Sequence, residues 1–98
     1  MPYIMPRSLY NSPISVFLAT EAKSLLGSFG INYHGDILTT TNEAWSEEIG
    51  IMKEVLQPWK DEPGQIIFEY DIPRLGKRID VVVLLRGIVF CLEFKVGI

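Results

Sequence analysis

Hydrophobic residues along the chain change from a helical to a strand-like spacing near the middle. Between about residues 41 and 57 they recur every three or four positions, which is typical of a helix with one buried face. Three further segments, about 65–72, 78–85 and 88–96, are rich in β-branched and aromatic residues and are separated by turn-forming sequences. We therefore predict a long helix followed by three consecutive β-strands.

The first forty residues carry weaker patterns. Residues 1–12 contain prolines and turn formers and are expected to be extended. The pair Ser12-Pro13 resembles the start of a helix, and a second short helix is predicted over 21–26. Residues 27–40 include three glycines and are expected to form an irregular connection.

The helix predicted near 41–57 has an acidic residue within its apolar face. Glu48 lies three positions after Trp45 and four before Met52, so its carboxyl group is predicted to face the protein interior. The apolar positions that define this face are Trp45, Ile49, Met52, Val55 and Leu56.

Two more carboxylates are brought together by the turn between the last two strands. Arg86-Gly87 is a two-residue connection, in which glycine supplies positive φ. A turn of this length fixes the register and places Asp80 opposite Glu93. Side chains alternate between the two faces of a strand, so Lys95 shares the face of both carboxylates. Most other positions on both faces are apolar, which predicts helices on two sides of the sheet.

Opposed carboxylates on such a sheet repel each other, and burial makes the ionised pair costlier. A shared proton, a basic partner or a divalent cation would relieve the repulsion. Lys95 can help, and a hard cation such as Mg²⁺ takes oxygen ligands and keeps several waters. Glu48 would supply a further oxygen. The alternative is an ordinary salt-bridged strand end, in which Glu93 pairs with Lys95 or Arg78, and Asp80 with a neighbouring arginine.

This set of residues resembles the signature of the PD-(D/E)XK nuclease superfamily, which has the restriction-endonuclease-like fold. The signature is a helix with Glu, a strand with Asp and a next strand with (D/E)-x-K, matched here by Glu48, Asp80, Glu93 and Lys95. Isoleucine, not proline, precedes Asp80. The stretches SPISVFLATEAKSLLGSF, AWSEEIGIMKEVL and FEYDIPRLGKRIDVVVLLRGIVFCLEFKVG are also similar to the N-terminal, nuclease-like region of bacterial ATPases that carry a Schlafen-group-3-like helicase domain.

The resemblance implies metal-dependent hydrolysis of phosphodiester bonds in nucleic acid, with DNA ahead of RNA as the substrate. Asp80, Glu93, Glu48 and the backbone carbonyl of Phe94 are implied as ligands of Mg²⁺ or Mn²⁺. Lys95 is implied to orient the attacking water or to stabilise charge on the phosphate. The cationic residues of the loop between the first two predicted strands would contact the phosphate backbone, and these are Arg74, Lys77 and Arg78.

The resemblance also predicts a single α/β domain over 1–98, with a helical segment at 1–40 and a core at 41–98. In the superfamily a further helix and strand follow the (D/E)-x-K strand, so the core is expected to be truncated after its third strand. An open apolar edge would favour a homo-oligomer. The alternatives to a nuclease are an inactive module that binds nucleic acid or protein, and a structural fragment that oligomerises through its sheet.

Charge and cysteine content narrow the class of protein. Nine Lys and Arg against twelve Asp and Glu give a net charge of −3, so nucleic-acid contacts would have to be local. The one cysteine, Cys91, excludes an intrachain disulfide and a cysteine metal cluster, and it is expected to be buried. A cytoplasmic location without a membrane segment is predicted, because neither a signal peptide nor an apolar run of eighteen residues is found.

Overall fold

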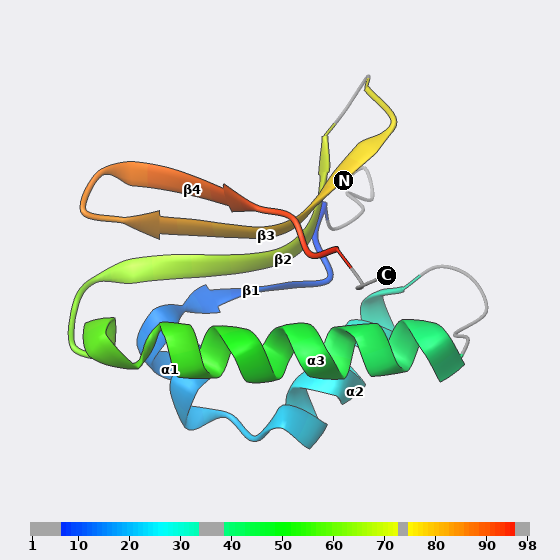
Figure 1. Cartoon of the computed structure of the whole chain (residues 1–98), viewed down its shortest axis with the longest axis horizontal. Helices are drawn as coiled ribbons and strands as arrows, with labels where there is room; N and C mark the ends of the chain where they lie inside the picture. Colours follow the sequence, from blue (N-terminus) through cyan, green and yellow to red (C-terminus); the bar gives the residue numbers. More distant parts are fainter. Residues whose placement is uncertain (1–6, 34–38, 73–74, 96–98) are drawn as a thin grey trace, which may run out of the picture.

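A four-stranded antiparallel sheet and three helices form the part of the chain that the computed structural model describes, residues 7–33, 39–72 and 75–95 (Figure 1). The strands lie in the order β1-β2-β3-β4, with bounds Tyr10–Pro13, Gly64–Ile72, Lys77–Leu85 and Ile88–Leu92. The helices are α1 (Ile14–Ala19), α2 (Ala22–Asn32) and α3 (Thr39–Val55), and a short 3₁₀ helix, η1, follows at Gln57–Trp59. No helix among these residues is long and apolar enough to cross a membrane.

The mixed α/β class and the run of three consecutive strands are confirmed, and the sheet gains a fourth strand at its other edge. The predicted extended segment ends in β1, where Tyr10 pairs with Phe68 of β2. The second helix does not stop at Gly27, because α2 continues to Asn32. Leu25 and Phe29 lie four positions apart on one buried face, so packing carries the helix past the glycine.

The predicted tight turn between β3 and β4 is confirmed. Arg86 and Gly87 both have positive φ, 54° and 76°, as a two-residue hairpin turn of this hand requires. Leu85 therefore pairs with Ile88, and the ladder continues to the pair Val81–Leu92. The third predicted strand is too long, because β4 ends at Leu92 and the next three residues leave the sheet.

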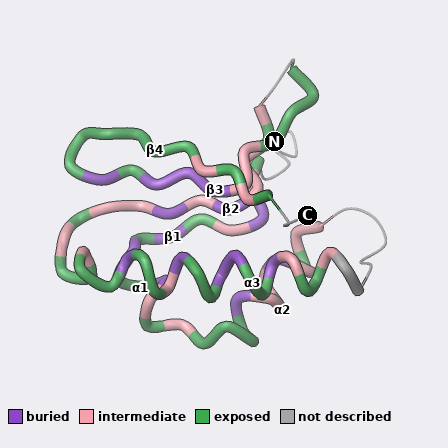
Figure 2. The backbone as a smooth tube through the Cα atoms, viewed as in Figure 1, coloured by how far each residue is buried: buried purple, intermediate pink, exposed green. Residues whose placement is uncertain are grey.

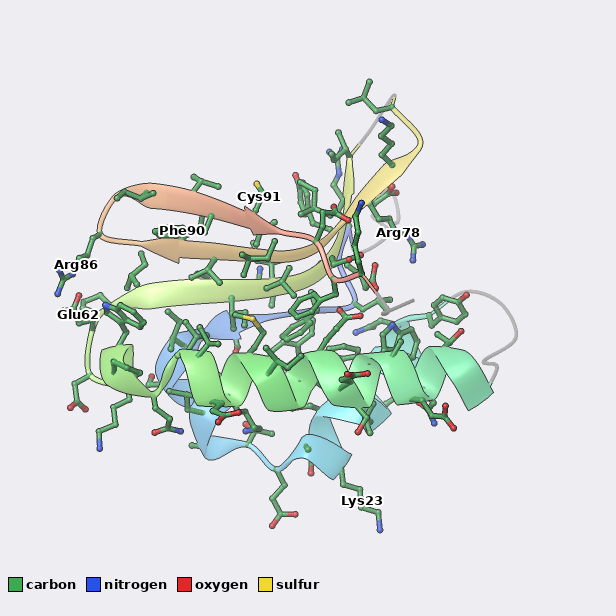
Figure 3. The ribbon with its side chains drawn as sticks, viewed as in Figure 1. Lys23, Glu62, Arg78, Arg86, Phe90 and Cys91 are labelled. Carbon is green, nitrogen blue, oxygen red and sulfur yellow. The ribbon has the colours of Figure 1, made fainter. Side chains whose placement is uncertain are left out.

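All three helices cover one face of the sheet, so the prediction of helices on both faces is wrong (Figure 1). The covered face holds the core, to which β2 contributes Ile66 and Phe68. The other face is partly open: Leu84 is 37% exposed and Val89 is 62% exposed. Cys91 is also exposed and points away from the helices (Figure 3), so its predicted burial is wrong as well. Of the five apolar positions predicted for α3, all but Val55 are buried.

Lys53 ties α3 to the end of α1. Its ammonium group donates hydrogen bonds to the backbone carbonyls of Phe17, Leu18 and Thr20, and it lies 4.9 Å from the centre of the Phe17 ring. These carbonyls lie in and just after the last turn of a short helix, where carbonyls lack the usual N–H partner four residues on, and only that of Phe17 also accepts a backbone N–H, from Thr20. A cation is also favoured there by the helix dipole.

Replacing this ammonium group should destabilise the fold. We expect Lys53→Met to lower the free energy of unfolding by about 1–3 kcal/mol, because the change keeps much of the aliphatic stem and removes charged hydrogen bonds. Urea titration measures the change. Lys23→Met is the control, since Lys23 is exposed and points away from the sheet (Figure 3). Equal loss in both variants, or no loss in Lys53→Met, would contradict this role.

Most of β4, the outer strand of the sheet, is exposed (Figure 2). Ile88, Val89 and Phe90 are 54%, 62% and 43% exposed, and no described strand pairs with the outer edge of β4. An edge of this kind is a template for pairing with another chain.

We expect the protein to self-associate weakly through this edge as its concentration rises, which sedimentation equilibrium would detect. Val89→Lys should abolish the association, because a lysine on an edge strand opposes strand pairing. Val16→Lys makes the same change at an exposed position of α1 and should leave the association unchanged. A protein that stays monomeric at every concentration would refute the expectation.

Candidate active site

Glu48 is the buried member of the predicted site, as its place on the inner face of α3 implies. It is only 8% exposed, and its Oε1 atom has no hydrogen-bond partner. Burial, and then the charges of Glu69, Asp80, Glu47 and Glu93, raise its pKa from 4.5 to about 8. A buried carboxyl oxygen without a partner is costly, so this atom indicates a missing ligand, a cation or a proton.

Asp80 does not stand in a strand pair with Glu93, because β4 has already ended. Instead the backbone N–H of Phe94 donates a hydrogen bond of 2.8 Å to Oδ2 of Asp80. This bond holds the segment after β4 against β3, so that the chain leaves the sheet and crosses back towards α3 (Figure 1). Asp80 is therefore positioned by β3, and Glu93 reaches the neighbourhood of Asp80 through the bend after β4 and not by continued strand pairing.

Glu69 of β2 is a site residue that the sequence analysis missed. In the structure its pKa is raised, first by burial and then by the charge of Asp80, and it lies near enough to Glu48 to raise the pKa of that residue. It also has a φ of 54°, which is uncommon for a residue other than glycine. Nothing in the sequence marks Glu69 for this conformation.

Within the described part of the chain, no basic side chain forms an ion pair with Glu48, Glu69, Asp80 or Glu93. The one ion pair there joins Arg86 to Glu62, at the other end of the β3–β4 hairpin (Figure 3). The salt-bridged strand end considered above, with Glu93 on Lys95 or Arg78, is therefore not formed. Arg78 still matters, because its charge lowers the raised pKa of Glu69.

Three of the remaining predicted site residues are exposed. Lys95 is exposed just beyond the Asp80–Phe94 bond, and Lys77 and Arg78 are exposed at the start of β3. Arg74 lies outside the described residues. The bond to Asp80 is made by the N–H of Phe94, and ligation by the Phe94 carbonyl stays a prediction.

Carboxylate oxygens are the kind of ligand that a hard divalent cation prefers, but the acidic residues of this region do not form a complete set of metal ligands. The charges of Asp80 and Glu93 contribute to the raised pKa values of both Glu48 and Glu69, and one buried oxygen of Glu48 lacks a partner. In the described residues no three acidic, histidine or cysteine side chains are close enough together to hold a metal ion. Mg²⁺ needs fewer than three protein ligands, because it is usually bound by one or two carboxylates and several waters.

Comparison of the chain with protein-family models, with curated proteins and with solved structures found no match.

The raised pKa of Glu48 predicts that stability falls as pH rises. Between about pH 4.5 and pH 8 the folded protein keeps a proton on Glu48 that the unfolded chain has lost. This group therefore stabilises the fold fully below its unfolded pKa, and the contribution is lost as pH rises through about 8, at up to about 1.4 kcal/mol per pH unit.

Glu48→Gln should remove this contribution, so the variant should gain stability relative to wild type as pH rises from 5 to about 8. Urea titrations at several pH values in the presence of a chelator would measure the difference. Glu54→Gln changes an exposed carboxylate of the same helix and should run parallel to wild type. A constant difference between Glu48→Gln and wild type across this range would show that Glu48 titrates normally.

Proposed function

We propose that the domain is a metal-dependent nuclease of the PD-(D/E)XK type, which hydrolyses phosphodiester bonds in nucleic acid. The observation that carries the proposal is the buried Oε1 of Glu48, which lacks a partner and lies where the charges of Asp80 and Glu93 reach it. Acidic side chains without basic partners are poor for stability, whereas a cation site needs them.

Asp80 and Glu93 would hold Mg²⁺ or Mn²⁺, and Glu48 would ligate directly or through water. Once bound, such an ion polarises a phosphoryl oxygen and lowers the pKa of a coordinated water. The Asp80–Phe94 hydrogen bond positions the segment that carries Glu93 and Lys95 beside β3. The bond would thereby set the distance between the carboxylates of Asp80 and Glu93.

Lys95 follows Glu93 by two residues and is exposed to an incoming substrate. Its ammonium group would orient the attacking water or stabilise the charge that develops on the phosphate. In the overall step the water oxygen bonds to phosphorus, the ester P–O bond breaks and a proton passes to the leaving oxygen. Lys77 and Arg78, exposed on the same hairpin, would position the phosphate backbone without reading sequence.

The test is cleavage of single- and double-stranded DNA and RNA with Mg²⁺, with Mn²⁺ and with chelator. We expect metal-dependent cleavage that falls by about a hundredfold or more in Asp80→Asn, Glu93→Gln and Lys95→Ala, since each removes a ligand or a charge needed at the phosphate. Glu62→Gln, at the far end of the hairpin, should keep wild-type activity.

Two other outcomes are informative. Wild-type protein that binds nucleic acid but cuts none would favour an inactive binding module, and Lys77→Ala with Arg78→Ala should then weaken binding and its salt dependence. Wild-type protein that neither binds nor cuts would reject the proposal.

A further inference from the structure

A cavity of about 410 Å³ lies at the β1 edge of the sheet, and no acidic residue lines it. This volume is within the range of sites that bind small ligands. The wall combines one cation, hydroxyl and amide groups and two aromatic rings, from Arg7, Ser8, Tyr10, Asn11, Asn32 and Tyr70.

Hydrogen bonds between distant segments of the chain hold this wall together. The N–H of Leu9 donates to the carbonyl of Phe68 at 3.0 Å, and the N–H of Asp71 donates to the carbonyl of Arg7 at 2.6 Å. The side-chain amide of Asn32, at the end of α2, donates a bond of 3.0 Å to the carbonyl of Leu9. The three segments that form the cavity are therefore fixed relative to one another before a ligand binds, which lowers the cost of binding.

Arg7 is the one cationic residue of the wall, and it is exposed. The ion pair in the described part of the chain joins Arg86 to Glu62, so no carboxylate there pairs with Arg7. Asp71 is exposed next to Tyr70 but does not line the cavity. A guanidinium group binds phosphate through two parallel hydrogen bonds, and hydroxyl and amide groups are the usual further donors to a phosphate.

The two aromatic residues of the wall have different surroundings. The Tyr10 ring belongs to the core, because its centre lies 5.9 Å from that of Phe29 and 6.2 Å from those of Phe17 and Phe68. Tyr70 is half-buried and is in none of the aromatic pairs among the described residues. Its ring can therefore stack on a base. A cation beside a stacking ring is the combination with which proteins bind single-stranded nucleic acid.

The cavity lies towards the same end of the sheet as Asp80. Tyr70 pairs with Ile79 in the ladder between β2 and β3, and Asp80 is the next residue of β3. β1 is separated from β3 only by β2, which amounts to two strand spacings, or about 10 Å. A single strand that is cut at Asp80 can reach the cavity with a nearby nucleotide, since sites for single strands cover several nucleotides.

We propose that this cavity binds one nucleotide of a single-stranded nucleic acid, with the Arg7 guanidinium on its phosphate and its base stacked on Tyr70. The inference rests on the proposed function for the class of substrate, and it deepens that function by naming the single strand as the form that is bound. Binding should depend little on sequence, because every base has a face that stacks on a tyrosine ring.

The first measurement is fluorescence anisotropy of a labelled oligothymidylate with the whole chain in chelator. We expect Arg7→Gln to lower the affinity about fivefold or more and to reduce the slope of log affinity against log salt by about 0.7, because one phosphate contact is lost. Arg7→Lys keeps the charge and should keep the slope. Lys23→Gln removes a charge from an exposed side chain that points away from the sheet (Figure 3). Equal losses in Arg7→Gln and Lys23→Gln would overturn the assignment of Arg7.

The second measurement uses Tyr70→Leu, which keeps an apolar side chain and removes the flat ring. Its affinity for the oligothymidylate should fall about fivefold or more with an unchanged salt slope. Tyr70→Phe keeps the ring and should bind within about twofold of wild type. Urea titration shows whether the variants are folded at the temperature of the assay. Wild-type affinity in a folded Tyr70→Leu would overturn the stacking.

Binding in chelator and cleavage with metal separate this inference from the proposed function. If Arg7→Gln and Tyr70→Leu bind as wild type does while Asp80→Asn loses cleavage, the cavity is not a nucleotide site and the nuclease proposal stands. The same holds for a wild-type protein that cuts duplex DNA but does not bind the oligothymidylate. Binding that depends on Arg7 and Tyr70 in a protein that cuts no nucleic acid would support the cavity and contradict the nuclease.

Discussion

The ring of Phe68 is the contact on which the arrangement of the whole domain depends. It projects from the middle of β2 and lies 5.5 Å from the ring of Phe17 in α1, 5.0 Å from that of Phe29 in α2, and 6.2 Å from that of Tyr10 in β1, measured between ring centres. One side chain of the sheet therefore fixes two helices and the edge strand. Aromatic pairs at these distances and tilts also add to the energy of burial.

The acidic group is a consequence of this packing. α3 presents one apolar face to the sheet, and Trp45, Ile49 and Met52 on that face are all buried. Glu48 lies on the same face and is carried into the interior by its neighbours, although its own desolvation opposes burial. The free energy gained by burying these apolar side chains therefore keeps the Glu48 carboxyl group near Glu69 and Asp80.

The sequence alone predicts those features that depend on nearby residues. The helical period identifies α3 and the burial of Glu48, and the Arg86-Gly87 turn fixes the register of β3 with β4. It does not predict the pairing of β1 with β2, since that depends on packing between distant segments. The continuation of α2 past Gly27 depends likewise on the burial of Phe29.

The predictions about the site that were wrong, and the residue that was missed, share a physical cause. The end of β4 at Leu92 coincides with the capture of the Phe94 N–H by the Asp80 side chain, a competition between side chain and backbone that periodicity does not describe. The positive φ of Glu69 is not a preference of glutamate but a property imposed by its surroundings. The open face of the sheet could not be inferred either, because valine and leucine on a strand do not reveal what covers them.

The topology has a consequence for the order in which the chain folds. β3 and β4 are joined by two residues, so this hairpin can form within microseconds of collapse, whereas β1 must find β2 across the whole helical segment, as the pairing of Tyr10 with Phe68 shows. The N-terminal strand is therefore expected to dock last, and until then β2 has a free edge like that of β4. Amide hydrogen exchange would report this order as earlier protection in β3 than in β1.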